Sequence, residues 1–413
     1  MDKARVVITG IGVISPVGLD LATAWDNLTA GRSGIGPITA FDTSGYDVTI
    51  AGEAHGFDPL NYLSPKEARR TDRFAQFALA ALQEALAQSR FSVEAGNCHD
   101  VGVIIGAGVG GIQTYSDEFD VLRSKGPKRV SPLLVPMITS DVPAVQVALR
   151  TGARGPNLGL SSACASGADA IGQAYETIRR GHAQVMITGG VEAAIVPISI
   201  ATFDRMRAIS HRNDDPQGAS RPFDAGRDGF VVSEGGAILI LEEMESALRR
   251  GAEPLAEMAG YAATSDAIHL AAPDSEGAGA ARCMSLALTR AGVLPEELGY
   301  INAHGTSTPL GDPSETRAIR EALGRYADRV AVSSTKSVTG HMIGGAGSFE
   351  AAVCVQVLRT GILPPTINLT APDPACDLDY VPGKARAADV TVTLSNSFGF
   401  GGHNCSLVLR RAP

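Results

Sequence analysis

The sequence predicts an α/β fold with a sizeable buried core. Short strand-like runs alternate with alanine-rich helical runs, a pattern typical of parallel strands joined by crossover helices. Of the 413 residues, 47 are Gly, 44% are hydrophobic and 19% are charged, as in compact α/β enzymes with many tight turns. The chain is longer than a domain with one ordinary hydrophobic core, so we expect two domains or one large fused unit.

The alternation can be followed along the chain. A strand at 5–11 precedes a helix at 21–30, a helix at 72–88 precedes a strand at 100–106, and a helix at 167–180 precedes a strand at 183–188. Gly10 and Gly12 interrupt the first apolar run, which predicts a buried strand and turn and argues against a secretory signal. The polar, Gly- and Pro-containing segment 210–228 predicts a long structured loop, and a softer division lies at 251–254.

Two segments look like copies of one βα design. Segment 156–181 contains a strand, a Ser-Ser pair, a helix of small residues and Arg-Arg-Gly. Segment 329–361 contains a strand, a Ser-Ser pair, a Gly-rich insertion, a helix and Arg-Thr-Gly. The first copy carries Cys164 where the strand turns into the helix, and the second carries Lys336 and His341 in its insertion. This similarity predicts an internal duplication.

Charge and cysteine usage argue against several classes of function. The formal net charge of −9 opposes general affinity for nucleic acid or for an anionic membrane. No run of 18 apolar residues predicts a membrane-spanning helix. The six cysteines have no CxxC spacing, which predicts neither a zinc site nor a disulfide framework. We therefore expect a cytoplasmic protein with reduced thiols, no metal and no cofactor.

The first reactive motif is the stretch 158–167, Leu-Gly-Leu-Ser-Ser-Ala-Cys-Ala-Ser-Gly. Apolar strand residues lead through small residues into a helix built of Ala and Gly. Cys164 is thereby placed at or near a helix N-terminus, where unpaired N–H groups and the helix dipole favour the thiolate. An average buried cysteine fills space, which is our interpretation of Cys354. For Cys164 the position predicts a nucleophile.

Two further stretches carry histidines in structured turns. In 301–308, a short strand ends at His304, at the strand end where α/β enzymes usually place their chemistry. Alone, a histidine in a polar turn is more often a structural hydrogen-bond partner. In the second stretch, Lys336, His341 and Glu350 lie within one Gly-rich loop and helix start, which predicts a preorganised charged network.

The last motif, 395–404, has glycines on both sides of Phe400. Glycines permit unusual backbone angles, so we expect Phe400 to swing as a gate while its N–H points into the site. The same stretch also predicts a glycine-rich hairpin between Val390 and Val408.

These four motifs, in this order, resemble those of the elongating β-ketoacyl-[acyl-carrier-protein] synthases, the synthase II branch of the thiolase-like superfamily. The resemblance covers nearly the whole chain and includes Arg-Pro-Phe-Asp at 221–224 and Arg-Asp-Gly-Phe at 227–230. It implies two fused βαβαβαββ halves stacked as a five-layered α-β-α-β-α body, and a homodimer. We place the nucleophilic cysteine in half 1–252 and the two catalytic histidines in half 253–413.

The resemblance also implies a role for each site residue. Cys164 takes an acyl chain from a carrier protein as a thioester, and malonate on a second carrier protein loses carbon dioxide to form the attacking carbanion. His304 and His341 match the donors that hold the malonyl thioester oxygen, and Lys336 and Glu350 match their supporting ion pair. The N–H groups of Cys164 and Phe400 match an oxyanion hole. Val109, Phe203 and Phe400 match acyl-pocket residues, and Thr306 and Thr308 match residues that bind the pantetheine arm.

Two positions depart from the family pattern. Ser162 stands where Thr is often found, and Ala271 stands where a hydroxyl residue is common, which removes one hydrogen bond to the pantetheine arm. The resemblance also predicts that an acidic acyl carrier protein docks on a local basic patch near the tunnel mouth, although the whole chain is acidic. The residues of this patch are Lys66, Arg69, Arg70, Lys128, Arg129 and Arg207.

Other interpretations fit less well. The run 106–111 satisfies GxGxxG, but a dinucleotide site needs a helix directly after it and an acidic residue closing a second strand about 20 residues on, where we predict a loop at 124–129. Chain-length factors lack the reactive cysteine, thiolases carry a second catalytic cysteine near the carboxyl end, and synthase III enzymes use Cys, His and Asn. A ketosynthase of a polyketide pathway, with the same chemistry, stays an open alternative.

Overall fold

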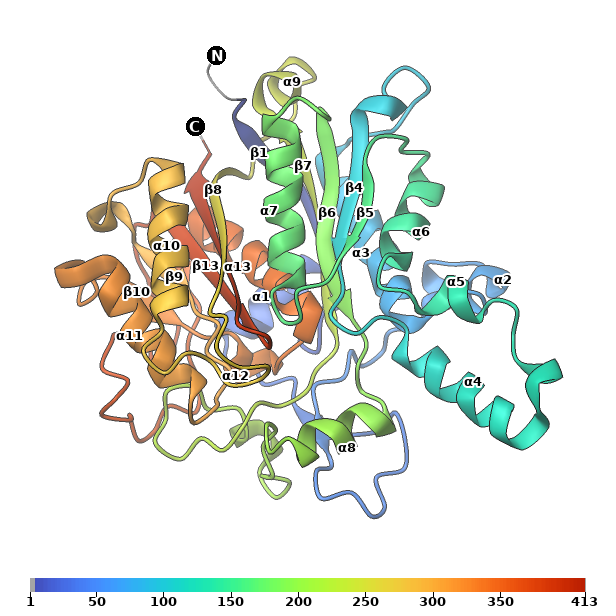
Figure 1. Cartoon of the computed structure of the whole chain (residues 1–413). Coiled ribbons are helices and arrows are strands. Elements are labelled where there is room, and N and C mark those ends of the chain that lie inside the picture. The colour runs from blue at the N-terminus through green and yellow to red at the C-terminus, as the bar shows by residue number, and fades with distance from the viewer. Residues whose placement is uncertain (1–3, 413) are drawn as a thin grey trace.

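The computed structural model describes residues 4–412 (Figure 1). Its main sheet contains the strands β1 (Val6–Ile14), β4 (Val101–Gly106), β5 (Asn157–Leu160), β6 (Val185–Glu192), β7 (Gly235–Glu243), β8 (Ala256–Ser265), β9 (Tyr300–Asn302), β10 (Ala331–Ser333), β13 (Val392–Gly399) and β14 (His403–Arg411). They are hydrogen-bonded in the order β10-β9-β13-β14-β8-β1-β7-β6-β4-β5. Two short ribbons pair β2 (Gly36–Pro37) with β3 (Ile50–Ala51) and β11 (Ile362–Leu363) with β12 (Arg386–Ala387).

The main sheet consists of two sets of five strands with the same topology. The first set is β1, β4, β5, β6 and β7, and the second is β8, β9, β10, β13 and β14. If each set is numbered in chain order, both have the spatial order 3-2-4-5-1. In both sets the first two neighbouring pairs of that order are parallel and the last two are antiparallel. The sets join where β1 pairs with β8.

The expectation of parallel strands is therefore correct only for the outer strands of each set. β6 ends at Glu192 and β7 begins at Gly235, and these two residues are paired across the sheet. The segment 193–234 thus leaves and re-enters the sheet at the same end, so β7 runs opposite to β6. β13 and β14 are likewise joined by a tight hairpin. Antiparallel pairs need no crossover helix, and the helical pattern alone does not reveal them.

Helices and strands alternate in five layers. The outer face of the first set is covered by α3 (Arg73–Ser89) and α6 (Val142–Thr151). Between the two sets lie α7 (Ser166–Arg179) and α13 (Ala346–Thr360), which contact strands of both (Figure 1). The outer face of the second set is covered by α10 (Ala278–Ala291) and α11 (Gly311–Leu323). The predicted α-β-α-β-α order is confirmed.

The remaining helices are shorter or lie at the periphery. They are α1 (Leu21–Thr29), α2 (Pro65–Ala68), α4 (Ile112–Lys125), α5 (Leu134–Ile138), α8 (Pro197–Arg205), α9 (Met244–Arg249) and α12 (Lys336–Thr339). The helices and strands predicted from the sequence occur within a few residues of their expected bounds. Segment 210–228 is a loop with one 3-10 turn, Pro216–Gly218, as predicted. Within residues 4–412, none of the helices has the length and hydrophobicity needed to cross a bilayer.

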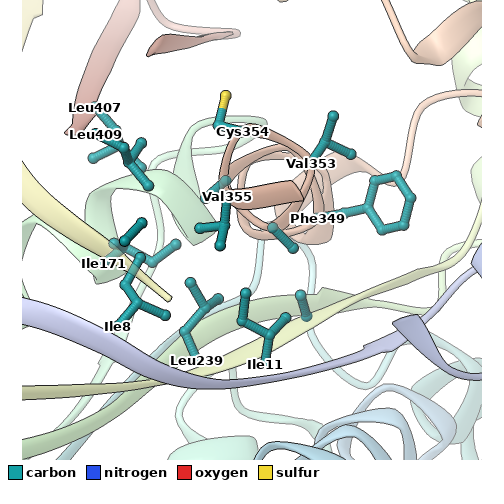
Figure 2. Close-up of a cluster of buried hydrophobic side chains, with 14 of the residues drawn as sticks. Ile8, Ile11, Ile171, Leu239, Phe349, Val353, Cys354, Val355, Leu407 and Leu409 are labelled. Atoms are coloured by element: carbon teal, nitrogen blue, oxygen red, sulfur yellow. The ribbon is translucent and has the colours of Figure 1, made fainter. Parts of the chain in front are cut away.

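The central core lies around α13, between the two sets of strands. Figure 2 shows Ile8 and Leu239 from the first set and Leu407 from the second set around Val355 of this helix. Cys354 is 0% exposed and packs in the same cluster. Its interpretation as a space-filling residue is therefore confirmed.

Gly10 and Gly12 lie inside β1, and the expectation of a turn there is wrong. A Cβ atom at Gly10 would lie 2.1 Å from the carbonyl oxygen of Ala85, and one at Gly12 would lie 1.9 Å from that of Ala81. Both carbonyls belong to α3, so the glycines allow this helix to pack directly on the strand. The pairing of β1 with β7 also shifts register between Ile8 and Gly10. Close helix packing, and not chain reversal, accounts for these glycines.

Candidate active site

Cys164 lies in the turn between β5 and α7. Ala163 just before it has φ of +52°, in the left-handed region, and Ser162 and Cys164 form an isolated bridge. The Ser166 hydroxyl accepts a hydrogen bond from the Ser162 N–H at 2.9 Å and donates to the Ala163 carbonyl at 2.6 Å. The N-cap of α7 is Ala165, so the thiol sits directly before the helix, as predicted.

The surroundings of Cys164 keep it protonated in the free protein. The residue is 5% exposed and belongs to an apolar cluster with Phe230 and Ile343. Burial raises the pKa of the Cys164 thiol to about 11, although the Lys336 charge and the Phe400 N–H lower it. Backbone N–H groups do favour the thiolate, as expected, but desolvation of the charged form outweighs them. The proton must leave as the sulfur attacks.

His304 and His341 line the same pocket as Cys164. Their ring centroids are 5.4 Å apart and the ring planes are nearly perpendicular, at 85°. Within the described part of the chain, neither ring nitrogen of His341 has a hydrogen-bond partner, and neither does Nδ1 of His304. Buried polar atoms are normally paired. Two imidazoles are thus available to a polar atom of a substrate placed beside the thiol.

Both imidazoles are neutral at neutral pH. Burial lowers the pKa of His304 and of His341 well below the usual value, and the charge of Lys336 lowers both further. A neutral imidazole keeps one N–H group, so each ring can donate one hydrogen bond. This state suits stabilisation of a developing oxyanion and does not suit proton donation by an imidazolium.

Lys336 and Glu350 form the predicted ion pair, and the Lys336 charge acts on both histidines although neither member of the pair lines the pocket. The ammonium contacts the carboxylate, and the two side chains are 1% and 2% exposed. Burial raises the pKa of Glu350, and the Lys336 charge opposes that effect. Removal of either partner would leave an uncompensated buried charge, at a cost of about 3–5 kcal/mol.

Glu315 on α11 holds the turn that carries His304, and sequence analysis did not single it out. Its carboxylate accepts hydrogen bonds from the N–H groups of His304 at 2.8 Å and Gly305 at 2.7 Å. It also accepts one from the Asn396 amide at 3.2 Å. In the sequence Glu315 is one acidic residue on an amphipathic helix. No local signal indicates that its carboxylate is buried beneath a histidine.

Asp312 organises the loop that carries the two expected pantetheine-binding residues. Thr306 and Thr308 line the pocket, with their hydroxyl oxygens 3.1 Å apart. The Asp312 carboxylate accepts hydrogen bonds from the N–H groups of Ser307 at 3.1 Å and Thr308 at 3.3 Å. It also accepts one from the Phe223 N–H at 2.8 Å. This contact explains how the Arg-Pro-Phe-Asp segment supports the site from a distance in the sequence.

Asp169, in the first turn of α7, anchors the nucleophile turn and was also missed. It accepts hydrogen bonds from the Ser162 hydroxyl at 2.5 Å and from the Tyr261 hydroxyl at 2.9 Å. Tyr261 belongs to β8, so the contact ties the Cys164 turn to the second set of strands. A Cβ atom at Gly172 would lie 2.1 Å from the Tyr261 ring. An acidic residue in a first helical turn is common, so its sequence position carried no special signal.

Phe400 lies at the tip of the β13–β14 hairpin, whose prediction is confirmed. A Cβ atom at Gly399 would lie 3.1 Å from the Cys164 nitrogen, so the hairpin reaches the nucleophile turn. Gly401 and Gly402 have φ of +82° and +75°. The Phe400 N–H lowers the pKa of the Cys164 thiol. The movement of Phe400 as a gate stays a prediction.

The two other expected acyl-pocket residues differ in their placement. Phe203 packs edge-to-face on Phe230, with ring centroids 5.4 Å apart, in the apolar cluster that contains Cys164. Val109 follows β4 and is 43% exposed. It is not among the residues that line the pocket of Cys164 in a single chain. The role of Val109 as an acyl-pocket residue stays a prediction.

The expected docking residues are all exposed, but they lie on separate segments. Lys66 and Arg69 belong to α2 and its end, and Lys128 lies in the 3-10 turn Pro127–Arg129 after α4. Arg207 follows α8 and precedes Ala208, which lines the pocket. Figure 1 shows α8 at the bottom of the molecule, and α2 and α4 at its right. Their grouping into one docking patch stays a prediction.

All six cysteines are free and buried. Cys164 is the one that lines the pocket among the residues that the structure describes. In residues 4–412, no group of three His, Cys, Asp or Glu side chains can hold a metal ion. The thiol of Cys164 and the imidazoles of His304 and His341 thus share one pocket.

The sequence matches two family models, the beta-ketoacyl synthase N-terminal domain over residues 3–247 and the C-terminal domain over residues 255–370. A similar relative is the 3-oxoacyl-[acyl-carrier-protein] synthase 2 of Synechocystis sp.. The two are 51% identical, and the match covers 100% of this chain and 99% of the relative.

Solved structures show the same likeness. A beta-ketoacyl synthase from Burkholderia phymatum STM815 has a TM-score of 0.93 and 37% identity, and the match covers 99% of this chain and 100% of that one. A type II polyketide ketosynthase, solved in complex with its acyl-carrier protein, has a TM-score of 0.89 and 33% identity, with 100% of both chains covered. With its two halves matched in sequence and its fold and pocket as described, the chain belongs to the beta-ketoacyl synthase family.

Proposed function

We propose that this chain is a 3-oxoacyl-[acyl-carrier-protein] synthase that joins a malonyl unit to a Cys164-bound acyl chain in fatty acid elongation. The observation that carries this proposal is one pocket lined by Cys164, His304 and His341. The identity of 51% to a synthase 2, against 33% to a polyketide ketosynthase, supports the fatty acid pathway.

The first half-reaction is acyl transfer to Cys164. The sulfur attacks the thioester carbonyl of the acyl carrier protein, its proton passes to the departing pantetheine thiolate, and the free carrier leaves. The negative charge that develops on the carbonyl oxygen is stabilised by the N–H groups of Cys164 and Phe400. Such preorganised donors cost no reorganisation during the reaction.

The second half-reaction takes place at the histidines. The malonyl thioester oxygen accepts hydrogen bonds from His304 and His341 while the bond to the terminal carboxylate breaks and carbon dioxide leaves. The resulting carbanion attacks the acyl thioester on Cys164, a carbon–carbon bond forms, and the Cys164 thiolate departs. The buried charge of Lys336, held by Glu350, stabilises this thiolate, and together with the larger effect of burial it favours the neutral form of both imidazoles.

A reconstituted condensation assay tests the proposal. Acyl carrier protein loaded with an acyl chain and carrier protein loaded with malonate are expected to give one 3-oxoacyl carrier protein and one carbon dioxide per cycle, measured by mass spectrometry and gas release. Repeated extension to an unreduced poly-keto chain would indicate the polyketide pathway. Cleavage of a 3-oxoacyl thioester without condensation would contradict the proposal.

We also propose that the chain forms a homodimer. Within each chain, we propose that the first half ends at residue 252 and the second begins at residue 253. The edge strand β5 is exposed, with Leu158 at 56%, and unpaired strand edges are normally covered. α4 and α5 bury none of their residues, and they expose Tyr115 at 51% and Val135 at 65%. An apolar face next to an open strand edge suits a second copy of the chain. Val109 lies beside this face, so a second copy can complete its surroundings.

In such a dimer, basic residues of two chains can together form the docking patch for an acidic carrier protein. Replacing Arg69, Arg129 and Arg207 with Glu is expected to raise the KM for carrier-protein substrates roughly tenfold, because rim charges act on association. Activity on a short pantetheine thioester should hardly change. The effect of the substitutions should shrink as salt rises, since the Debye length falls to about 3 Å near 1 M.

A matched control is Arg249→Glu, an exposed charge on α9 at the opposite end of the molecule (Figure 1). It should leave both kinds of substrate unaffected. Equal losses on carrier-protein and pantetheine substrates would place the patch elsewhere. Light scattering that reports a single chain of 42.7 kDa would contradict the dimer on which the patch depends.

A further inference from the structure

The carboxylate of Glu192, at the end of β6, is buried and takes no part in the chemistry described above. The residue is 0% exposed. Its oxygens accept hydrogen bonds from the N–H groups of Gly108 at 2.7 Å, Val109 at 3.1 Å and Gly110 at 3.2 Å, and from that of Gly344 at 3.2 Å. Four backbone donors from two distant segments thus converge on one side chain.

In the part of the chain that the structure describes, backbone N–H groups, and not a positively charged side chain, are the hydrogen-bond donors to this carboxylate. Burial raises the pKa of Glu192 to about 7, although all four N–H groups lower it. A buried carboxylate costs free energy of folding that an apolar side chain of similar size does not. The four hydrogen bonds offset this cost, and they attach the two segments to β6.

The donors at 108–110 belong to the GxGxxG run that resembles a dinucleotide-binding motif. The structure meets one requirement of that motif, because α4 begins at Ile112, directly after the run. The predicted loop at 124–129 is only partly correct, since it contains the last turn of α4 followed by a 3-10 turn. The N–H groups that would hold a phosphate in such a motif are directed at Glu192. The anion bound by this turn is therefore a side chain of the protein itself.

Glycines make the close approach of the segments possible. A Cβ atom at Gly108 would lie 2.8 Å from a carboxylate oxygen of Glu192. One at Gly344 would lie 2.3 Å from the Gly108 nitrogen and 2.8 Å from the same oxygen. The turn after β4, the segment after His341 and the carboxylate therefore fit only without side chains at these positions.

The two segments that Glu192 joins lie next to the residues of both proposed half-reactions, Cys164 and His341. The turn at 107–111 carries Val109 and touches the nucleophile turn, where the Ser161 hydroxyl donates to the Gly108 carbonyl at 3.3 Å. The other segment contains Ile343, which packs in the apolar cluster of Cys164, and it follows His341 directly. Glu192 thus fixes the position of the turn at 107–111, which lies beside the Cys164 turn, relative to the segment that follows His341.

We propose that Glu192 is a positioning residue that holds the Val109 turn against the Cys164 turn and the His341 segment, and thereby sets the selectivity of the enzyme among acyl chains of different length. The inference rests on the proposed function, because it takes Val109 to border the bound acyl chain. The side-chain length of Glu192 determines the fit of the turn, since the carboxylate must reach donors on both segments.

The charge of Glu192 also acts on Cys164. It raises the pKa of the thiol, whereas Lys336 lowers it. Above about pH 8 the carboxylate is ionised, because its pKa is about 7. Replacement by a neutral residue is therefore expected to lower the thiol pKa, so that thiolate forms at lower pH. A residue that only filled space would not have this effect.

Two substitutions separate charge from length. Glu192→Gln keeps the length but removes the charge and turns an NH2 group towards N–H donors. Glu192→Asp keeps the charge but is too short by one methylene. Both variants are expected to reduce the ratio of kcat/KM between the best and the poorest acyl donors roughly fivefold. Only Glu192→Gln is expected to move the pH profile of Cys164 alkylation by iodoacetamide to lower pH.

A matched control is Glu242→Gln, because Glu242 is a 1% exposed carboxylate on β7 that bonds to Arg250 at 2.8 Å and not to the pocket. It should lower thermal stability and leave both profiles unchanged. The proposal is overturned if the acyl-length and alkylation profiles of both Glu192 variants coincide with those of the wild type. If Glu192→Gln does not fold, the acyl-length profile of Glu192→Asp decides alone. A folded wild type that condenses no acyl units would contradict the proposed function, while the alkylation profiles would still test the position of Glu192.

Discussion

Replacing Cys164 with Ala is expected to abolish acyl-enzyme formation and to reduce condensation by roughly 10³-fold or more, because no other group can hold the acyl chain. Cys164 lines the pocket with His304 and His341, and the Phe400 N–H lowers the pKa of its thiol. Incubation with acyl carrier protein followed by intact-protein mass spectrometry measures the acyl adduct. Release of 3-oxoacyl product measures the overall reaction.

Cys354→Ala is the matched control for the loss of a thiol. Cys354 is also buried, but it packs in the central core (Figure 2) and does not line the pocket. This variant is expected to lose some stability through the cavity it creates and to keep its acyl adduct. An adduct of normal yield in Cys164→Ala would contradict the assignment. Cys164→Gln is expected to retain malonyl decarboxylation, since that step uses the histidines and not the sulfur.

Replacing His304 or His341 with Ala is expected to reduce malonyl decarboxylation roughly 100-fold or more, the scale of losing one oxyanion-hole donor. Acylation of Cys164 should largely survive, because in the proposed mechanism the N–H groups of Cys164 and Phe400 serve that step. Carbon dioxide release from malonyl carrier protein, measured in the Cys164→Gln background, isolates the decarboxylation. The acyl adduct of each single variant measures the other half-reaction.

The double variant sharpens this test. Two donors to one oxygen act as a unit, so the loss in the double variant should be smaller than the product of the single losses. His182→Ala is a suitable control, because His182 is exposed in the turn after α7. Unchanged decarboxylation in both single variants would contradict the division of labour. Equal losses of acylation and decarboxylation would indicate that the substitutions disturb the whole pocket.

The sequence by itself determined the fold class, most element positions and the residues of the candidate site. Cys164, His304, His341 and Phe400 each lie in a short contiguous motif, and the local backbone of that motif already directs the group. The turn before Cys164 depends on small neighbours such as Ala163, at φ of +52°, and on the Ser166 hydroxyl two residues later. Local interactions of this kind are readable from adjacent residues, and so is the pairing of Lys336 with Glu350, which lie within one loop and helix.

Only the tertiary structure decided the properties that depend on residues far apart in the chain. Glu315, Asp169 and Glu192 are isolated acidic residues in the sequence, and their buried hydrogen bonds exist only after distant segments have packed together. The pKa of Cys164 was misjudged for the same reason, because desolvation sums over every neighbour and here exceeds the effect of the helix end. Gly10 was likewise misread, since the helix that packs on it begins more than sixty residues later. Local sequence directs the reactive groups, whereas solvent exclusion and long-range contacts set their charge and fix their positions.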